Sequence, residues 1–291
     1  MLGFMLSNEI LSYMVDEPRA GKLLLGDSRV LRLLMILVLG YAGIVCFALF
    51  FSDNIIFHPL PASYQDCREI VKIPTADGAR ISTLYFDNSD AHFTILYSHG
   101  NAEDIGDIRP ITKALSNHGF SVLAYDYRGY GTSDGKPSEN GVYQDIETVY
   151  SYMVNEMKIH PRTILGLGRS LGNGPSIHLA SVKELAGIIL ESPFVSAYRV
   201  LTRFPLIPFD KFRNGATIQR VTCPVLVIHG DNDRIIPFWH GKAIFERANE
   251  PKLSLWVKGA GHFDLMEIAG SHYWGAISDL LKIVEDHGSN L

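Results

Sequence analysis

The chain has 291 residues, of which 47% are hydrophobic and 20% charged, so it can bury one large α/β domain or two small ones, and wholesale disorder is excluded. The formal net charge is -5, and no run of Lys and Arg is long enough to follow a phosphate backbone, which argues against nucleic acid as a partner. The three cysteines are isolated and no C-x-x-C occurs, so we expect neither a disulfide scaffold nor a thiolate zinc site.

The first element is an apolar run from Leu33 to Phe51, which contains 19 residues and no charge. As a helix it would be about 28 Å long, close to the ~30 Å hydrocarbon core of a bilayer. A buried core helix is the alternative, but the run has no polar face. We therefore predict a transmembrane anchor over residues 31–52, between an N-terminal segment over residues 1–30 and a globular domain over residues 53–291.

The flanking basic residues predict the orientation of this anchor. The 20 residues before the run hold four basic side chains and the 20 after it hold one: Arg19, Lys22, Arg29 and Arg32 against Arg68. Cytoplasmic flanks carry the excess of Lys and Arg. We therefore expect a single-pass protein with a cytoplasmic N-terminus and a non-cytoplasmic globular domain. Residues 1–30 mix apolar and charged side chains, a pattern compatible with an interfacial helix.

The globular part alternates between strand-like and helix-like stretches. The expected strands are residues 68–73, 79–86, 92–98, 121–125, 163–167, 187–190, 225–229 and 253–257. The expected helices are residues 107–118, 139–157, 171–181, 239–247 and 273–286. Helices between strands imply right-handed crossovers, and the first two strands form a hairpin. We predict an α/β fold with a mainly parallel eight-stranded sheet and one antiparallel edge.

The strongest chemical signal is GRSLG at residues 168–172, which fits G-x-S-x-G and lies between a predicted strand and a predicted helix. In that context the glycines allow a tight turn that presents Ser170 as a nucleophile. The helix N-terminus below it offers free N–H groups to a developing oxyanion. The alternative is an ordinary structural turn.

A nucleophilic serine needs a base, and the base needs an orienting acid. The segment HGDNDRIIP that begins at residue 229 holds two candidate acids. We favour Asp233, with Asp231 shaping the turn, and Glu191 at the end of the preceding strand is a weaker rival. His262 in GAGHFD, after the last strand, is the candidate base, because flanking glycines let the loop carry the imidazole over the sheet.

A further segment, SHGNA at residues 98–102, follows the first parallel strand. Its glycine lets the backbone approach a substrate, and we expect the N–H groups of Asn101 and Leu171 to form an oxyanion hole. The alternative is an ordinary glycine turn. Three neighbouring polar residues are expected to be structural rather than catalytic: His99, Asp126 and Arg128.

Taken in order, the motifs HGN, DYRGYG, GRSLGNGP, HGDNDRIIP and GAGHFD resemble those of the α/β-hydrolase superfamily, over roughly residues 66–287. The chain is most similar to the abhydrolase-domain-containing serine hydrolases, a branch that includes membrane-anchored proteins and protein depalmitoylases. This resemblance implies an α/β-hydrolase fold with a Ser-His-Asp triad and no cofactor or metal. The depalmitoylases of that branch carry a cysteine-rich N-terminus, whereas this chain has an apolar run in its place.

The segment between the strands ending at Leu190 and starting at Val225 occupies the cap position and is short. Its apolar, proline-broken run Phe204–Phe209 either packs over the sheet or forms an acyl-binding or membrane-touching lip. The expected activity is hydrolysis of a carboxylic ester or thioester of a small or lipid-like acyl substrate. A serine peptidase or amidase on the same triad, and a non-catalytic scaffold on a hydrolase fold, are the alternatives.

Overall fold

The computed structural model describes residues 28–288, and the chain divides into two compact units between Ser52 and Asp53. The described part of the first unit lies in helix α1 (Ser28–Ile56), which runs on into the first residues of the second unit. Residues 29–56 are long and apolar enough, by length and composition alone, to cross a membrane.

Helix α1 is longer than the predicted apolar run, because no proline or glycine follows Phe51 until Pro59. Its apolar side chains are largely exposed, as for Phe50, which is 78% exposed. The interfacial helix expected within residues 1–30 lies outside the described residues, apart from the three that begin α1.

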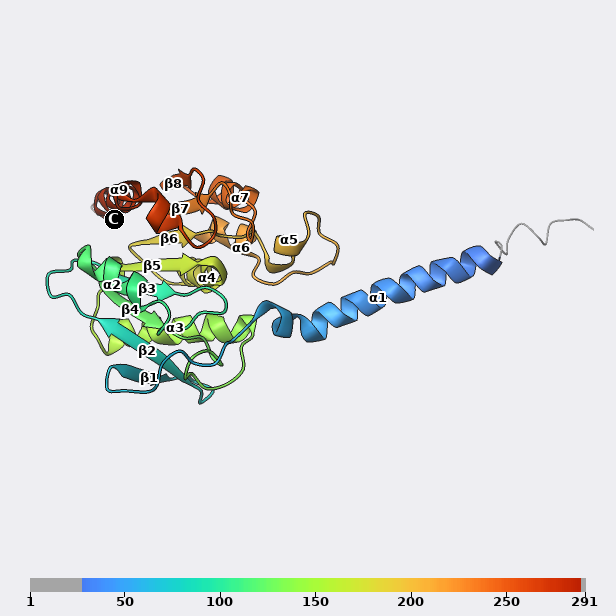
Figure 1. The fold of residues 1–291 in the computed structure, drawn as a ribbon, viewed down its shortest axis with the longest axis horizontal. Coiled ribbons are helices and arrows are strands. Elements are labelled where there is room, and N and C mark those ends of the chain that lie inside the picture. The colour runs from blue at the N-terminus through green and yellow to red at the C-terminus, as the bar shows by residue number, and fades with distance from the viewer. Residues whose placement is uncertain (1–27, 289–291) are drawn as a thin grey trace, which may run out of the picture. The chain divides into compact units, whose positions relative to one another are not determined.

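The second unit is built on an eight-stranded sheet with the order β1-β2-β4-β3-β5-β6-β7-β8 (Figure 1). The strands are β1 (Ile70–Pro74), β2 (Arg80–Phe86), β3 (Thr94–Ser98), β4 (Ser121–Tyr125), β5 (Ile164–Arg169), β6 (Gly187–Glu191), β7 (Val225–Gly230) and β8 (Lys252–Val257). Strands β3 to β8 are parallel to one another, and β2 is antiparallel to both β1 and β4. The predicted α/β fold with an antiparallel edge is therefore confirmed.

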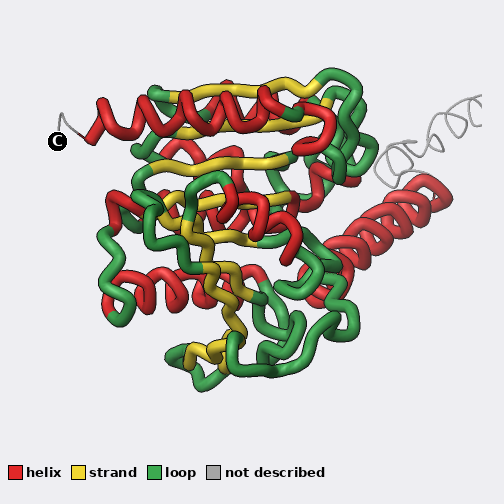
Figure 2. The backbone as a smooth tube through the Cα atoms, turned by 60° about the vertical axis from the view of Figure 1, so that its left-hand side comes forward, coloured by secondary structure: helices red, strands yellow, loops and turns green. Residues whose placement is uncertain are grey.

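Helices cover both faces of this sheet, and Figure 2 shows them on either side of the strands. The α-helices are α2 (Arg109–Asn117), α3 (Glu139–Asn155), α4 (Asn173–Val182), α5 (Ala197–Leu201), α6 (Asn214–Thr217), α7 (Trp239–Arg247), α8 (Leu265–Ala269) and α9 (Ser271–Gly288). Short 3-10 turns are η2 (Pro161–Thr163), η3 (Ser170–Gly172) and η4 (Ile218–Arg220). The helix predicted over residues 171–181 thus begins with a 3-10 turn.

Two apolar cores hold the layers together. One lies between the sheet and helices α3, α4 and α7, and the other between the sheet and helices α2, α8 and α9. Strands β5 and β6 are buried along their whole length, which explains why they are almost entirely apolar in sequence.

The register of the parallel strands brings their carboxyl ends together. Ser98 of β3 pairs with Gly168 of β5, and Arg169 of β5 pairs with Glu191 of β6. The loops that follow β3, β5, β6, β7 and β8 therefore leave the sheet at one edge, which is where ligands bind in open α/β sheets.

Candidate active site

Ser170 lies at the sharp turn between β5 and η3. Its φ angle is 52°, in the left-handed region, which costs a non-glycine residue of order 1–3 kcal/mol. Such a backbone persists only where the surrounding structure imposes it. The turn places Ser170 half-buried at the end of the sheet, as the first residue of η3.

The two motif glycines are required for close approach rather than for an unusual backbone angle. A Cβ on Gly168 would lie 2.6 Å from the carbonyl oxygen of Gly172, and a Cβ on Gly172 would lie 2.0 Å from that of Ser98. Neither glycine has a positive φ, so the left-handed residue of the motif is Ser170 itself. This corrects the sequence-based explanation that glycine flexibility makes the turn.

The structure brings Ser170, His262 and Asp233 together in one chain of hydrogen bonds. Nε2 of His262 lies 3.0 Å from Oγ of Ser170, and Nδ1 lies 2.7 Å from Oδ2 of Asp233. An ionised carboxylate only accepts hydrogen bonds, so Nδ1 carries the proton and Nε2 is free to accept the proton of the serine hydroxyl. The arrangement has the geometry of a nucleophile, a base and an orienting acid.

Asp233 is held rigidly from the loop after β7. Its Oδ1 accepts hydrogen bonds from the N–H groups of Ile235 (2.9 Å) and Ile236 (2.8 Å). Burial raises the pKa of this carboxyl, but the hydrogen bonds from His229 and His262 outweigh that effect and hold the pKa well below its usual range. Asp233 is therefore ionised at neutral pH and can stabilise a protonated His262.

The two rival acids lie elsewhere. Asp231 accepts a hydrogen bond from the N–H of Gly259 and so ties the β7 loop to the β8 loop. Glu191 is buried and accepts a hydrogen bond from the hydroxyl of Tyr273. Burial raises the pKa of Glu191 above its usual value. Of these three carboxylates, Asp233 is the one that is hydrogen-bonded to the candidate base His262.

The loop after β3 passes beside the candidate nucleophile. A Cβ on Gly100 would lie 3.7 Å from that of Ser170, so the Gly100–Asn101 backbone is within reach of a group bound there. Leu171 is in the first turn of η3, where backbone N–H groups have no partner within the helix. The two predicted oxyanion-hole residues are thus both next to the serine, Leu171 in the chain and Asn101 through the loop after β3.

Comparison with known proteins decides the family. The chain is 40% identical over 214 residues to human (Homo sapiens) alpha/beta hydrolase domain-containing protein 17B, a match that covers 72% of this chain and 73% of that protein. The chain belongs to the α/β-hydrolase domain-containing protein family. It is also 41% identical over 179 residues to alpha/beta hydrolase domain-containing protein aho-3 of Caenorhabditis elegans, covering 60% of this chain and 54% of that protein.

Two further likenesses are consistent with this α/β-hydrolase assignment. A family model described as serine aminopeptidase, S33, matches residues 89–212, which include Ser170 but not Asp233 or His262. The fold is similar to that of the esterase Pf2001 from Pyrococcus furiosus, with a TM-score of 0.64 and 21% sequence identity over 77% of this chain and 98% of that one. At that identity the likeness establishes the fold alone.

A pocket of about 320 Å³ opens beside His262 in this α/β hydrolase. Helix α2, the His262 loop and helix α8 supply its apolar lining, and the strand ends supply two charged side chains. The lining residues are Pro110, Ile111, Ala114, Arg169, Glu191, His262, Phe263, Leu265, Met266 and Glu267. Its volume is at the lower end of the range of small-molecule sites.

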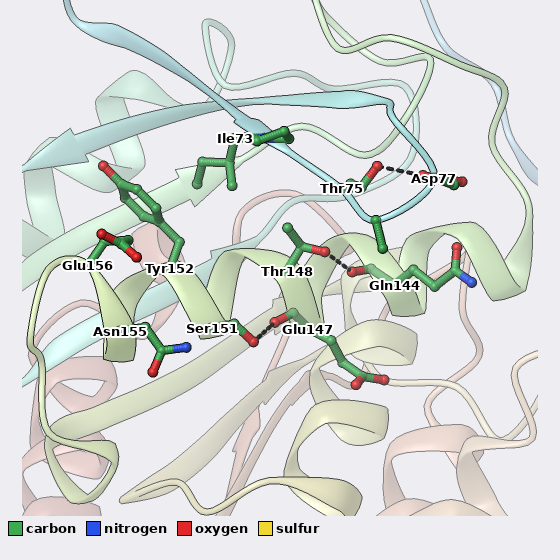
Figure 3. A pocket seen from close by; sticks show the side chains of 12 residues that line it. Ile73, Thr75, Asp77, Gln144, Glu147, Thr148, Ser151, Tyr152, Asn155 and Glu156 are labelled. Carbon is green, nitrogen blue, oxygen red and sulfur yellow. Dashed lines mark hydrogen bonds between the residues drawn. The ribbon is translucent and has the colours of Figure 1, made fainter.

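A larger hollow of about 900 Å³ lies between the turn after β1 and helix α3 (Figure 3). Its lining includes Thr75 and Asp77, which are hydrogen-bonded to each other, and a series of polar side chains from α3. None of the residues that line it belongs to the Ser170–His262–Asp233 group. The size of a hollow therefore does not identify the one that lies beside these three residues.

The three polar residues expected to be structural form other contacts. His99 is fully buried, with Nε2 lying 3.4 Å from Oδ1 of Asp126, and Arg128 forms ion pairs with Asp145 and Asp77. These contacts connect the loops after β3 and β4 to each other and to helix α3 and the turn after β1. They agree with a bracing role for these side chains.

Sequence reasoning missed an ion pair at the residue directly before the serine. Arg169 forms an ion pair with Glu103 (3.4 Å), and its guanidinium carbon lies 5.8 Å from the centre of the Phe263 ring. Glu103 also accepts a hydrogen bond from the N–H of Gly100. A buried arginine next to the nucleophile is the signal that could have found this ion pair, since such a charge needs a partner.

The apolar run Phe204–Phe209 does not pack over the sheet, since Phe204 is 71% exposed. It belongs to the cap segment between β6 and β7, and none of its residues lines the pocket beside His262. The apolar surface next to the candidate base therefore comes from α2, α8 and the His262 loop.

Proposed function

We propose that this α/β hydrolase is a membrane-anchored serine hydrolase that cleaves carboxylic esters or thioesters through an acyl-enzyme. The observation that carries the proposal is the unbroken hydrogen-bond chain from Ser170 through His262 to Asp233. No cofactor or metal takes part in this reaction as we propose it.

In the first step His262 Nε2 accepts the proton of the Ser170 hydroxyl while Oγ attacks the substrate carbonyl carbon. The ionised Asp233 holds the imidazole in the required tautomer and stabilises the imidazolium. The tetrahedral intermediate collapses, and His262 returns the proton to the departing alcohol or thiol. Water then attacks the acyl-enzyme with the same base and releases the acid.

The developing negative charge falls on the substrate oxygen, and the N–H groups of Asn101 and Leu171 are the proposed donors to it. Both follow the carboxyl end of a parallel strand, Asn101 after β3 and Leu171 after β5, as the serine does. Oxyanion-hole donors act in the transition state, and each is worth roughly 10²–10³ in turnover.

The pocket beside His262 is the proposed site for an apolar part of the substrate. Ile111, Ala114, Leu265 and Met266 supply apolar surface there, and the pocket touches the base that must face the scissile bond. This combination supports an acyl or lipid-like substrate rather than a small polar one.

A serine peptidase or amidase is the second candidate, because the matching family model is described as a serine aminopeptidase. The same triad can attack an amide carbonyl. Turnover of matched ester and peptide substrates by the purified protein separates the two candidates.

The anchor in this proposal is the apolar part of α1, from Leu33 to Phe51. Its length, its composition and its exposed side chains support a membrane span. The excess of basic residues before it favours a cytoplasmic N-terminus and a non-cytoplasmic hydrolase domain.

The test uses the full chain in detergent. A fluorophosphonate probe should label the wild type, and the chain should hydrolyse p-nitrophenyl esters. Ser170→Ala should abolish both. Equal labelling and turnover of the variant would overturn the proposal, and a wild type inert to every ester, thioester and peptide tested would leave the non-catalytic scaffold.

A further inference from the structure

The last residues of helix α1 and the residues that follow it belong to the second unit and are bound tightly within it. Within the second unit, Asp53 forms an ion pair with Lys211 at the base of the cap. Phe57 is 3% exposed, and its ring centre lies 5.9 Å from that of Phe212. The residues around Phe57 therefore belong to the folded domain and do not form a loose tether.

The next contacts of this segment are with the side chain of Asn101. Nδ2 of Asn101 donates to the carbonyl oxygen of Ile56, the last residue of α1, at 2.6 Å. Oδ1 accepts the N–H of His58 at 3.0 Å and the hydroxyl of Tyr130 at 2.6 Å. The N–H of His58 also lies 3.0 Å from the Tyr130 hydroxyl. The nitrogen of the Asn101 amide is thus bound to Ile56, and its oxygen is bound to His58 and Tyr130.

The backbone of this loop is in a conformation that needs such support. Ala102, directly after Asn101, has a φ of 57°, which is strained for a residue other than glycine. The Asn101 amide also accepts the N–H of Ala102 at 3.2 Å. One side chain therefore fixes the strained turn and joins it to Ile56 and His58.

We infer that residues 56–58 hold the oxyanion-hole loop in place, with the side chain of Asn101 as a positioning residue. The inference rests on the proposed function, in which the backbone N–H of the same residue faces the oxyanion. The chain that leaves the anchor is then a part of the active-site architecture. A donor displaced by about 1 Å can cost roughly 10²-fold in turnover. Because the oxyanion forms only in the transition state, we expect loss of the Asn101 side chain to lower kcat rather than to raise KM.

The first test compares the full chain in detergent with Asn101→Ala, using p-nitrophenyl acetate. We expect kcat to fall about 10- to 100-fold while KM changes by no more than about twofold. An alkyl boronic acid, whose serine adduct places an oxygen in the hole, should bind more weakly by a similar factor. A purely structural role would not weaken the analogue in step with kcat.

A matched control is Asn249→Ala. Nδ2 of Asn249 also donates to two backbone carbonyls, those of Gln219 and Val221, both at 2.9 Å. It lies outside the site, so its loss should leave kcat and boronate binding unchanged. If Asn101→Ala does not fold, Tyr130→Phe, which removes one hydroxyl from the amide, should still lower kcat several-fold at constant KM.

The second test asks whether the segment acts through Asn101. His58→Pro removes the N–H that reaches the amide, and the double variant with Asn101→Ala should be no slower than the slower single variant. If the double variant instead loses kcat by the product of the two single losses, the inference is overturned. A wild-type kcat in Asn101→Ala would also overturn it. If Ser170→Ala keeps full activity, the proposed function itself is wrong, whereas an inactive Ser170→Ala beside a fully active Asn101→Ala overturns only the role of this segment.

Discussion

The carboxylate of Asp231 accepts a hydrogen bond from the backbone N–H of Gly259 at 2.7 Å. Two residues later, Asp233 turns its own carboxylate to His262 at the same distance. The two acids of this loop thus make different contacts. Asp231 joins the β7 loop to the β8 loop, and Asp233 is bound to the candidate base.

This division predicts unequal effects of two isosteric substitutions. Asp233→Asn should lower turnover by around 10⁴-fold, because the amide cannot hold the imidazole in the required tautomer. Asp231→Asn keeps an oxygen acceptor for Gly259 and should lower turnover by less than about tenfold. Steady-state kinetics on folded variants checks the order, and the reverse order would reject Asp233 as the acid.

Gly172 should not tolerate even one methyl group. Its Cβ would meet the carbonyl oxygen of Ser98 at 2.0 Å, a contact that backbone must move to relieve. We expect Gly172→Ala to lower the thermal midpoint markedly and to abolish probe labelling. Gly275, in helix α9 with no atom near its Cβ position, is the matched control. Gly275→Ala should raise stability by up to about 1 kcal/mol, and equal effects of the two changes would contradict the steric explanation.

His240 should make stability depend on pH. It is fully buried in α7 and accepts the N–H of Val195 at 3.2 Å. Burial, together with a smaller effect of the neighbouring His229 ring, lowers the pKa of His240 to about 4, although the charge of Asp233 opposes this. The unfolded chain, with a histidine pKa of about 6.5, binds a proton below that pH that the folded chain does not bind.

The contribution of His240 is therefore fully present above about pH 6.5 and declines as the pH falls toward 4, by about 2 kcal/mol between pH 7.5 and pH 5. His240→Asn cannot titrate but keeps an acceptor. Thermal unfolding of the full chain in detergent at both pH values should show a smaller loss for the variant. An identical loss in both proteins would count against this role of His240.

The pocket beside His262 predicts a preference for longer acyl chains. Each buried methylene adds up to ~0.8 kcal/mol, so hexanoate should exceed acetate in kcat/KM by up to roughly two orders of magnitude. Ala114→Phe would fill the pocket and should remove the preference while keeping acetate turnover. Phe204→Asp, on the exposed cap run, should leave the preference intact. If the cap variant alone loses it, the acyl group lies against the cap.

The proposed topology can be checked with sealed vesicles. With the N-terminus cytoplasmic, protease added to right-side-out vesicles should digest the hydrolase domain and spare the N-terminal segment. Protection of the domain until the membrane is permeabilised would refute the proposed orientation but not the membrane span.

The strands were predictable because each is a short apolar run between turn residues, and β5 and β6 are buried on both faces. Ser170, Asp233 and His262 could be proposed because each follows a strand at the edge where parallel strands end. The ion pair of Arg169 with Glu103 and the amide contacts of Asn101 with Ile56 and His58 were not predictable. They depend on which loops meet in space: the charge of Arg169 signals that it needs a partner, but spacing along the chain does not identify Glu103 as that partner.

The backbone conformation at Ser170 is unfavourable for the stability of the fold, whereas the hydroxyl at this position is required for the proposed reaction. With a φ of 52°, the position would suit glycine, which has no Cβ to strain and would relieve the turn. A glycine there would have no hydroxyl to offer His262. A lineage that kept the fold but lost the reaction would be expected to gain stability by exchanging this serine first. Serine at position 170 therefore combines a strained backbone with a hydroxyl that lies 3.0 Å from Nε2 of His262.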